Sequence, residues 1–326
     1  KKKIENKKPD WRKYLLYTLS AAMLTAPLFV PGMVRAAEPE SEYKKESGQD
    51  KEESKSPVSW KFKDGVLTVS GEGEMLDYSG TEEVPWIAVR DSVRKIVIEE
   101  GITSIGKQSF SNFENLEEVV FPETLKIIGN GAFFECSSLA QVILPESVER
   151  LGAGAFAGCR SLASFSGKGV VIFGNFVFER TALTSFEIPE KTTKVSALTF
   201  LGTPVGEYTV QSGNTEFSAK DGVLFNADRS KLEIYPAEKE EKGYQIPEGC
   251  TEIGRYAFRD VKNLKSIDLT GVVSLEEGAF YGASLSGKLI LPDSLTKLEG
   301  GFLFENCTEL TSVDFGKGLE ETSYRM

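Results

Sequence analysis

Two consecutive copies of one 23-residue unit constrain the fold of this chain more than any other feature. Residues 116–161 read LEEVVFPETLKIIGNGAFFECSS and then LAQVILPESVERLGAGAFAGCRS, and the two copies align without a gap. A fixed period of this length predicts a solenoid, in which each repeat forms one rung and buries its apolar residues against the next rung. Repeats also make chain length a poor guide to the number of domains.

The same unit recurs along the chain, and its most regular position is a late Phe. This Phe is found at Phe110, Phe133, Phe156, Phe178, Phe200, Phe258, Phe280 and Phe304. Each unit opens with alternating apolar residues, typical of a short strand with one buried side. A Pro such as Pro122 ends the strand, because Pro cannot continue the hydrogen-bond ladder. We interpret the Gly that follows the second aliphatic slot, as at Gly106, as permitting a strained turn.

These units resemble the BspA-like (Treponema pallidum-type) leucine-rich repeats, which read L-x-x-V-x-I-P-x-x-V-x-x-I-G-x-x-A-F-x-x-C-x-x. The resemblance covers roughly residues 93–204 and 244–319. It implies a repeat solenoid of the α/β leucine-rich repeat type, with parallel stacked short strands and short helical turns. It also implies a bacterial protein that is secreted or displayed on the cell surface and is linked to adhesion and protein binding. The chain departs from the pattern at Ser166-Gly167, where the Pro is missing, and at Leu285–Glu309, where two extra residues loosen the register.

The N-terminal segment has the pattern of an exported protein. Residues 1–37 combine a basic start, an apolar run and small residues at Ala36 and Ala37, which predicts a signal peptide cleaved near that point. The mature chain would then carry no transmembrane segment and would be secreted or lie on the cell surface. Residues 38–57 contain almost no apolar residue and predict a disordered linker. We expect the sequence to be a fragment, because it lacks an initial Met and ends within a repeat.

Three further regions complete the expected organisation. Residues 58–90 predict an N-terminal β-hairpin cap, in which Trp60 and Trp86 are expected to be buried rather than to form a binding patch. Repeats fill residues 91–204 and 244–326, and the second set is expected to be truncated. The period breaks in residues 205–243, where two strand patterns predict an inserted β-hairpin. We favour a spacer packed over neighbouring rungs over the alternative, a finger that contacts a partner.

The composition excludes several kinds of chemistry. The chain has no His, which removes Ser-His-Asp and Cys-His nucleophiles and HExxH zinc sites, and its net charge of −11 argues against nucleic acid as a partner. Phosphate-loop, dinucleotide and calcium motifs are absent, so we expect no catalytic residue, metal or cofactor. Cys136 and Cys159 occupy a repeat slot that elsewhere holds Phe113 or Thr181, which indicates packing. The sequence leaves open whether these two cysteines are bonded.

Binding is the better functional hypothesis. The outward positions of three consecutive strands hold Val97, Val120 and Ile143, flanked by the outward residues Glu118 and Gln141. An exposed apolar stripe of this kind marks an interaction site, although β-branched residues are also simply favoured on strands. The expected partner is a protein or glycan on a host or bacterial surface. The alternative is a structural stalk that presents a domain beyond the C-terminus, and the sequence does not indicate the oligomeric state.

Overall fold

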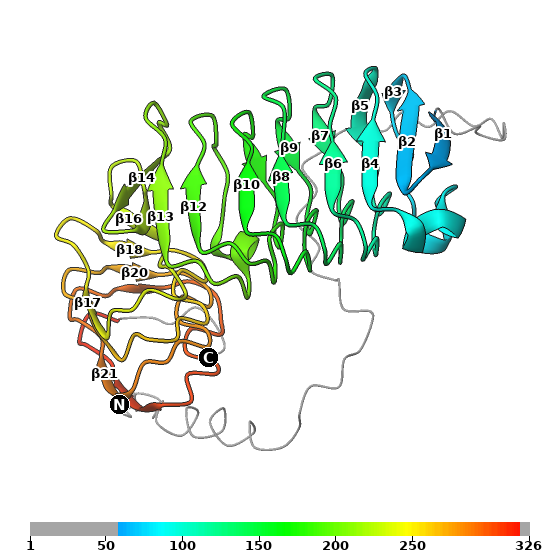
Figure 1. Ribbon diagram of the computed structural model, residues 1–326. Coiled ribbons are helices and arrows are strands. Elements are labelled where there is room, and N and C mark those ends of the chain that lie inside the picture. The colour runs from blue at the N-terminus through cyan, green and yellow to red at the C-terminus, as the bar shows by residue number, and fades with distance from the viewer. Residues whose placement is uncertain (1–57, 320–326) are drawn as a thin grey trace, which may run out of the picture. The chain divides into compact units, whose positions relative to one another are not determined.

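The computed structural model describes residues 58–319 of the chain, where short parallel strands stack as rungs (Figure 1). The predicted solenoid is confirmed. The predicted signal peptide and linker lie outside the described residues. Within residues 58–319 the only helices are three 3-10 helices, η1 Thr81–Glu83, η2 Ile87–Ser92 and η3 Ala197–Phe200. Most segments expected to be short helical turns are therefore single hydrogen-bonded turns.

Most rungs carry two strands, and the first strands of successive rungs form the first row. This row contains β2 Val66–Gly71, β4 Lys95–Ile98, β6 Glu118–Val120, β8 Gln141–Ile143, β10 Ser164–Ser166, β12 Ser185–Ile188, β13 Glu207–Val210, β17 Gly243–Gln245, β19 Ser266–Asp268, β21 Gly287–Ile290 and β23 Leu310–Asp314. Neighbouring strands are parallel, but the row divides into five short ladders, β2–β4–β6, β8–β10, β12–β13, β17–β19 and β21–β23.

The second strands of the rungs form a more continuous second row. It contains β3 Gly73–Glu74, β5 Ile102–Ile105, β7 Ile127–Ile128, β9 Arg150–Leu151, β11 Ile172–Phe173, β16 Lys231–Ile234, β18 Glu252–Ile253, β20 Ser274–Leu275 and β22 Lys297–Leu298. One ladder joins β3 through β11, and another joins β16 through β22. We call the rungs before residue 205 the first stack and those after residue 238 the second stack. Within each stack, strands of the second row remain hydrogen-bonded at the rungs where the first row is divided between two ladders.

The late Phe residues face the interior, and the rings of consecutive turns stack on one another. Phe133 is fully buried, and its ring centroid lies 5.4 Å from those of both Phe110 and Phe156. In the second stack the same contact joins Phe258 to Phe280 at 5.0 Å. Stacked rings at this spacing add to the free energy gained from burying each ring. The aromatic ladder thus forms the centre of both stacks.

Backbone hydrogen bonds between turns run beside the aromatic ladder. In the turn around Phe133, the N–H groups of Gly131, Phe133 and Glu135 donate to carbonyl oxygens of the next turn at 2.9, 2.8 and 2.7 Å. Gly131 and Glu135, the first and third donors, have φ values of +59° and +55°. The same three bonds and the same two left-handed residues recur in the turns around Phe110, Phe156, Phe178, Phe258 and Phe280. Each regular joint therefore needs two left-handed residues.

The Gly after the second aliphatic slot has a different role from the one expected. Gly106 and Gly129 do not have positive φ, so the interpretation as strained-turn residues was wrong. A Cβ on Gly106 would lie 1.8 Å from the carbonyl oxygen of Leu76, and one on Gly129 would lie 2.8 Å from that of Ile105. These glycines let the backbones of consecutive rungs approach closely.

The N-terminal cap pairs β1 Val58–Lys63 antiparallel to β2, which confirms the predicted hairpin. Trp86 is fully buried and stacks on Phe110 at 5.2 Å, while its indole N–H donates to the carbonyl of Ser109 at 2.8 Å. Trp60, however, is 39% exposed, so its predicted burial was wrong. Trp60 lies on β1, the edge strand of its sheet, where no further strand covers the side chain.

The insert forms three antiparallel strands, β14 Phe217–Lys220, β15 Val223–Asn226 and β16, so the predicted hairpin is confirmed. One rung is shared between the stacks, because its first strand β13 pairs with β12 and its second strand β16 pairs with β18. We call residues 207–238 the split rung. Leu224 packs in the core of the first stack, while its neighbours Val223 and Phe225 pack in that of the second. β15 is therefore buried on both faces and packs against both stacks.

Candidate interaction site

The outward side chains of β4, β6 and β8 form the surface that the sequence singled out. Their inward neighbours Ile96 and Val142 are buried, so alternation directs Val97, Val120 and Ile143 away from the core. Val120 is 39% exposed and Ile143 is 61% exposed, whereas Val97 is half-buried. Val97 and Val120 are direct register partners on paired strands. We call these three side chains the apolar stripe.

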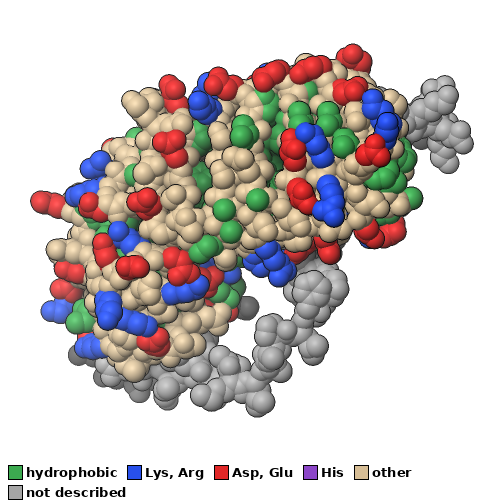
Figure 2. Space-filling view, in the orientation of Figure 1, with side chains coloured by type: hydrophobic (Ala, Val, Ile, Leu, Met, Phe, Trp, Pro, Cys, Tyr) green, Lys and Arg blue, Asp and Glu red, His purple; other side chains and the backbone are tan. Residues whose placement is uncertain are grey.

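Polar side chains border the apolar stripe. Glu118 is exposed, and its carboxylate lies 2.7 Å from the ammonium of Lys95. Gln141 is exposed and stands opposite Ser164 in the next strand. Figure 2 shows hydrophobic side chains over these strands with acidic and basic side chains beside them. The border is therefore polar, and its charges are largely paired with one another.

The apolar stripe ends where the next rungs place small or charged residues outward. Ser166 stands opposite Ile143 in the register of β10, and Glu187 occupies the corresponding place on β12. In the second stack Ile290 occupies the equivalent outward position and is 63% exposed. Ile290 lies between rungs that carry Asp268 and Asp314 there, so it is a single apolar residue rather than part of a stripe.

The cysteines pack in the core. All four are free and buried, and the thiols of Cys136 and Cys159 donate to the carbonyls of Phe110 and Phe133, each at 3.2 Å. Burial raises the pKa of the Cys136 thiol well above its ordinary value. Such thiols are poor nucleophiles, because the thiolate is the reactive form. The part of the chain that the structure describes holds no cluster of three Cys, Asp or Glu side chains suited to a metal ion.

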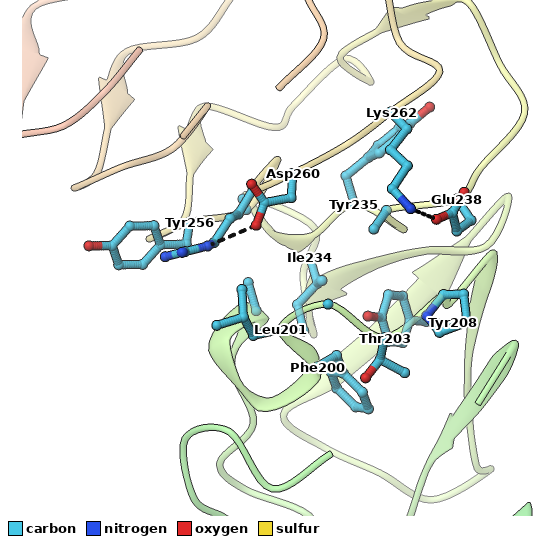
Figure 3. A pocket seen from close by; sticks show the side chains of 16 residues that line it. Phe200, Leu201, Thr203, Tyr208, Ile234, Tyr235, Glu238, Tyr256, Asp260 and Lys262 are labelled. Carbon is cyan, nitrogen blue, oxygen red and sulfur yellow. Dashed lines mark hydrogen bonds and ion pairs between the residues drawn. The ribbon is translucent and has the colours of Figure 1, made fainter. Parts of the chain in front are cut away.

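One feature was not anticipated from the sequence: a cavity of about 80 Å³ at the split rung. Its walls come from the last turn of the first stack, with Phe200 and Thr203, and from the first turn of the second stack, with Tyr256 and Asp260 (Figure 3). Ile234 of β16 lies between them. The sequence held one signal of this irregular rung: Tyr235 replaces the late Phe, and Pro236 stands at the next position of the turn.

The stacked parallel rungs, the buried aromatic ladder and the outward-facing strands define a repeat protein of the leucine-rich repeat class. Residues 89–205 and 238–326 match the BspA type leucine-rich repeat region in six copies. The chain therefore belongs to the BspA-type leucine-rich repeat family, as the sequence motifs indicated. Within residues 58–319, we find no helix with the length and apolar character needed to cross a membrane.

Solved structures share this architecture. A leucine-rich repeat protein from Eubacterium ventriosum is 28% identical, with a TM-score of 0.64, and the match covers 80% of this chain and 70% of that one. The pneumococcal vaccine antigen PcpA is 19% identical, with a TM-score of 0.57, and 80% of each chain is covered. At that identity the second match shows the fold alone. No curated protein matches the sequence of this chain.

Proposed function

We propose that this protein is a non-catalytic recognition protein that binds a protein or glycan of a host or bacterial surface through the apolar stripe. The supporting observation is that Val120 and Ile143 lie on the first strands of consecutive rungs and are both exposed and apolar in a family solenoid. Transfer of such a side chain from water into an interface contributes about 1.5–3 kcal/mol when burial is complete. Two or three adjacent residues of this kind are enough to form the energetic centre of a binding site.

Glu118 and Gln141 would give this interface its specificity. Their exposed side chains border the apolar residues, and each offers hydrogen-bonding groups that a partner would have to satisfy. Polar groups at the rim of an apolar centre discriminate partners more than they add affinity. Val120 and Ile143 would thus supply most of the affinity, and the polar border would supply the selectivity.

The proposed function fits an exported protein. In this proposal residues 1–37 direct secretion, residues 38–57 act as a tether, and the repeats of residues 91–204 and 244–326 display the strand face outside the cell. The apolar character of residues 14–34 and the polarity of residues 38–57 support this arrangement.

The test compares two substitutions with a matched control. Val120→Lys with Ile143→Lys places two charges on the apolar stripe, while Ile290→Lys places one charge on an equally exposed Ile in the second stack. In pull-downs from host and bacterial surface extracts, a specific partner should be retained by the parent chain and by Ile290→Lys, and lost by the double variant. Equal recovery by all three proteins would refute the apolar stripe and favour a stalk function.

A further inference from the structure

In the turns around Phe133, Phe156, Phe178 and Phe280, one peptide group connects the turns on either side of it. In the turn around Phe133, the carbonyl of Phe134 accepts the N–H of Asn112 at 2.7 Å, and the N–H of Glu135 donates to Ala157 at 2.7 Å. These two groups belong to the same peptide unit. That unit therefore accepts the third of the three hydrogen bonds from the preceding turn, and donates the third of the three hydrogen bonds to the following turn.

The split rung lacks this connecting peptide unit. In the last turn of the first stack, Gly202 stands where Glu135 stands in its turn, so its N–H should donate to such a unit. In the first turn of the second stack, Arg259 stands where Phe134 stands, so its carbonyl should accept from that unit. Within residues 58–319, the Gly202 N–H and the Arg259 carbonyl make no hydrogen bond. Both residues line the cavity at the split rung. The lining of the cavity thus includes one residue with an unpaired backbone donor and another with an unpaired backbone acceptor.

The sequence of the split rung explains the missing unit. Tyr235 takes the place of the late Phe, and its ring stacks on Phe258 at 4.9 Å. The connecting unit would then be Pro236–Ala237, but Pro236 disfavours the turn conformation in the residue before it. Ala237 does not have the positive φ of a third donor. Instead, the Pro236 carbonyl accepts from Lys239 at 3.3 Å and that of Ala237 from Lys262 at 3.1 Å.

The surroundings of the cavity favour an uncharged occupant with a small apolar group. Phe200, Ile234 and Ala237 supply apolar walls. At the rim, Lys262 is paired with Glu238, and Arg259 is paired with Asp260 at 3.2 Å (Figure 3). Because these charges neutralise each other, a charged ligand would have to break an existing pair. The 80 Å³ volume is about half that of a cavity of about 150 Å³ that holds benzene, which excludes a fully inserted aromatic ring.

We propose that this cavity binds an uncharged, extended peptide segment from a partner protein. One peptide group of the segment accepts a hydrogen bond from Gly202 N–H and donates one to the Arg259 carbonyl, replacing the unit that the split rung lacks. A neighbouring side chain of about the size of Val enters between Phe200 and Ile234. Peptides that complete an interrupted backbone ladder gain affinity from main-chain hydrogen bonds and specificity from the pocket that takes their side chain. The site is separate from the apolar stripe.

The experiment titrates the peptide acetyl-Gly-Val-Gly-amide into the ¹⁵N-labelled chain and follows its amide signals. Saturable shifts are expected at Gly202 and in residues 256–262, with the Gly202 amide moving downfield as it gains a hydrogen bond. Two further probes each carry one methyl group on a backbone nitrogen, either that of Val or that of the following Gly. The probe whose methyl group removes the N–H that donates to the Arg259 carbonyl should bind about tenfold more weakly. Shifts confined to other regions would overturn the proposal.

Two variants complete the test. Ala237→Leu fills the cavity and should weaken binding at least about tenfold, whereas Ala163→Leu, at an exposed Ala of the first stack, should leave it unchanged. Equal affinity for both variants would overturn the proposal, and the methylated probes decide the question if Ala237→Leu does not fold. Concentration-dependent shifts at Gly202 without any probe would identify a second copy of the chain as the occupant and would also overturn it.

Discussion

The joints within the first stack and the split rung show how the same repeat is connected in two ways. Around Phe133, three hydrogen bonds and two ring contacts tie each turn to its neighbours. At the split rung, the rings of Phe200 and Tyr235 are not in contact. Of the three hydrogen bonds that a regular turn donates to the next turn, only the one from Tyr235 N–H to the Ala257 carbonyl forms here. At the split rung, neither the first donor position, Glu233, nor the third, Ala237, has the positive φ of a regular turn. The insert and Pro236 therefore interrupt the stacking at this rung.

The largest expected effect comes from removing a ring inside the aromatic ladder. Phe133→Ala should lower the free energy of unfolding by about 3–5 kcal/mol, because a buried ring with a stacked partner on each side leaves a cavity that cannot collapse. Phe200→Ala should cost less, because Phe200 already borders the split-rung cavity. Urea unfolding measures both, with Phe302→Ala, 55% exposed, expected to change stability by less than about 0.5 kcal/mol. Equal losses at Phe133 and Phe200 would contradict the distinction between the two kinds of joint.

A smaller effect is expected from adding a methyl group between rungs. Gly129→Ala should lower the free energy of unfolding by about 1–3 kcal/mol, because its Cβ would meet backbone atoms of the preceding rung at 2.8 and 2.9 Å. At the start of the split rung, a Cβ on Gly206 meets only the Thr184 carbonyl at 3.6 Å, an ordinary contact. Gly206→Ala should therefore be neutral or stabilising by about 0.4–1 kcal/mol. Thermal unfolding of the two variants would show whether rungs are packed more loosely there.

Restoring the regular residue at the split rung should have a modest stabilising effect. The hydroxyl of Tyr235 is buried and has no hydrogen-bond partner within residues 58–319. Tyr235→Phe removes this unsatisfied group and should raise the free energy of unfolding by about 1 kcal/mol. The control is Tyr256→Phe, which loses a 2.9 Å hydrogen bond to Glu277 and should not stabilise. A loss of stability in Tyr235→Phe would indicate that the hydroxyl is satisfied in solution.

The smallest effect concerns the cysteines of the second stack at alkaline pH. Burial raises the pKa of Cys250 to about 11 and that of Cys307 to about 12. Because the folded thiols keep their protons while unfolded thiols lose theirs, the contribution of these thiols to stability should be constant below about pH 8 and fall above it. Urea midpoints between pH 8 and 10 should decline less steeply in Cys250→Ala than in the parent chain. The same slope in both proteins would show that Cys250 does not contribute.

Much of the fold was predictable from local pattern. The late Phe and the alternation of strands such as Leu116–Phe121 identified inward and outward residues correctly, because each rung repeats the same environment. Trp60 was predicted wrongly, because its burial depended on a neighbouring strand that the sheet edge does not have. The role of Gly106 was also misread, because sequence does not distinguish a left-handed turn from a close approach of two backbones. The outward direction of Val120 and Ile143 was predictable, whereas their exposed fractions were not.

The sequence by itself determined the period, the family, the opening strand of each rung and the recurring late Phe. A repeat imposes the same local environment again and again, so its pattern is readable without coordinates. Only the tertiary structure decided that one rung divides its two strands between the stacks, and that Gly202 N–H and the Arg259 carbonyl have no hydrogen-bond partner within residues 58–319. Those outcomes depend on contacts between segments far apart in the chain, where Pro236 and the insert shift which backbone groups meet.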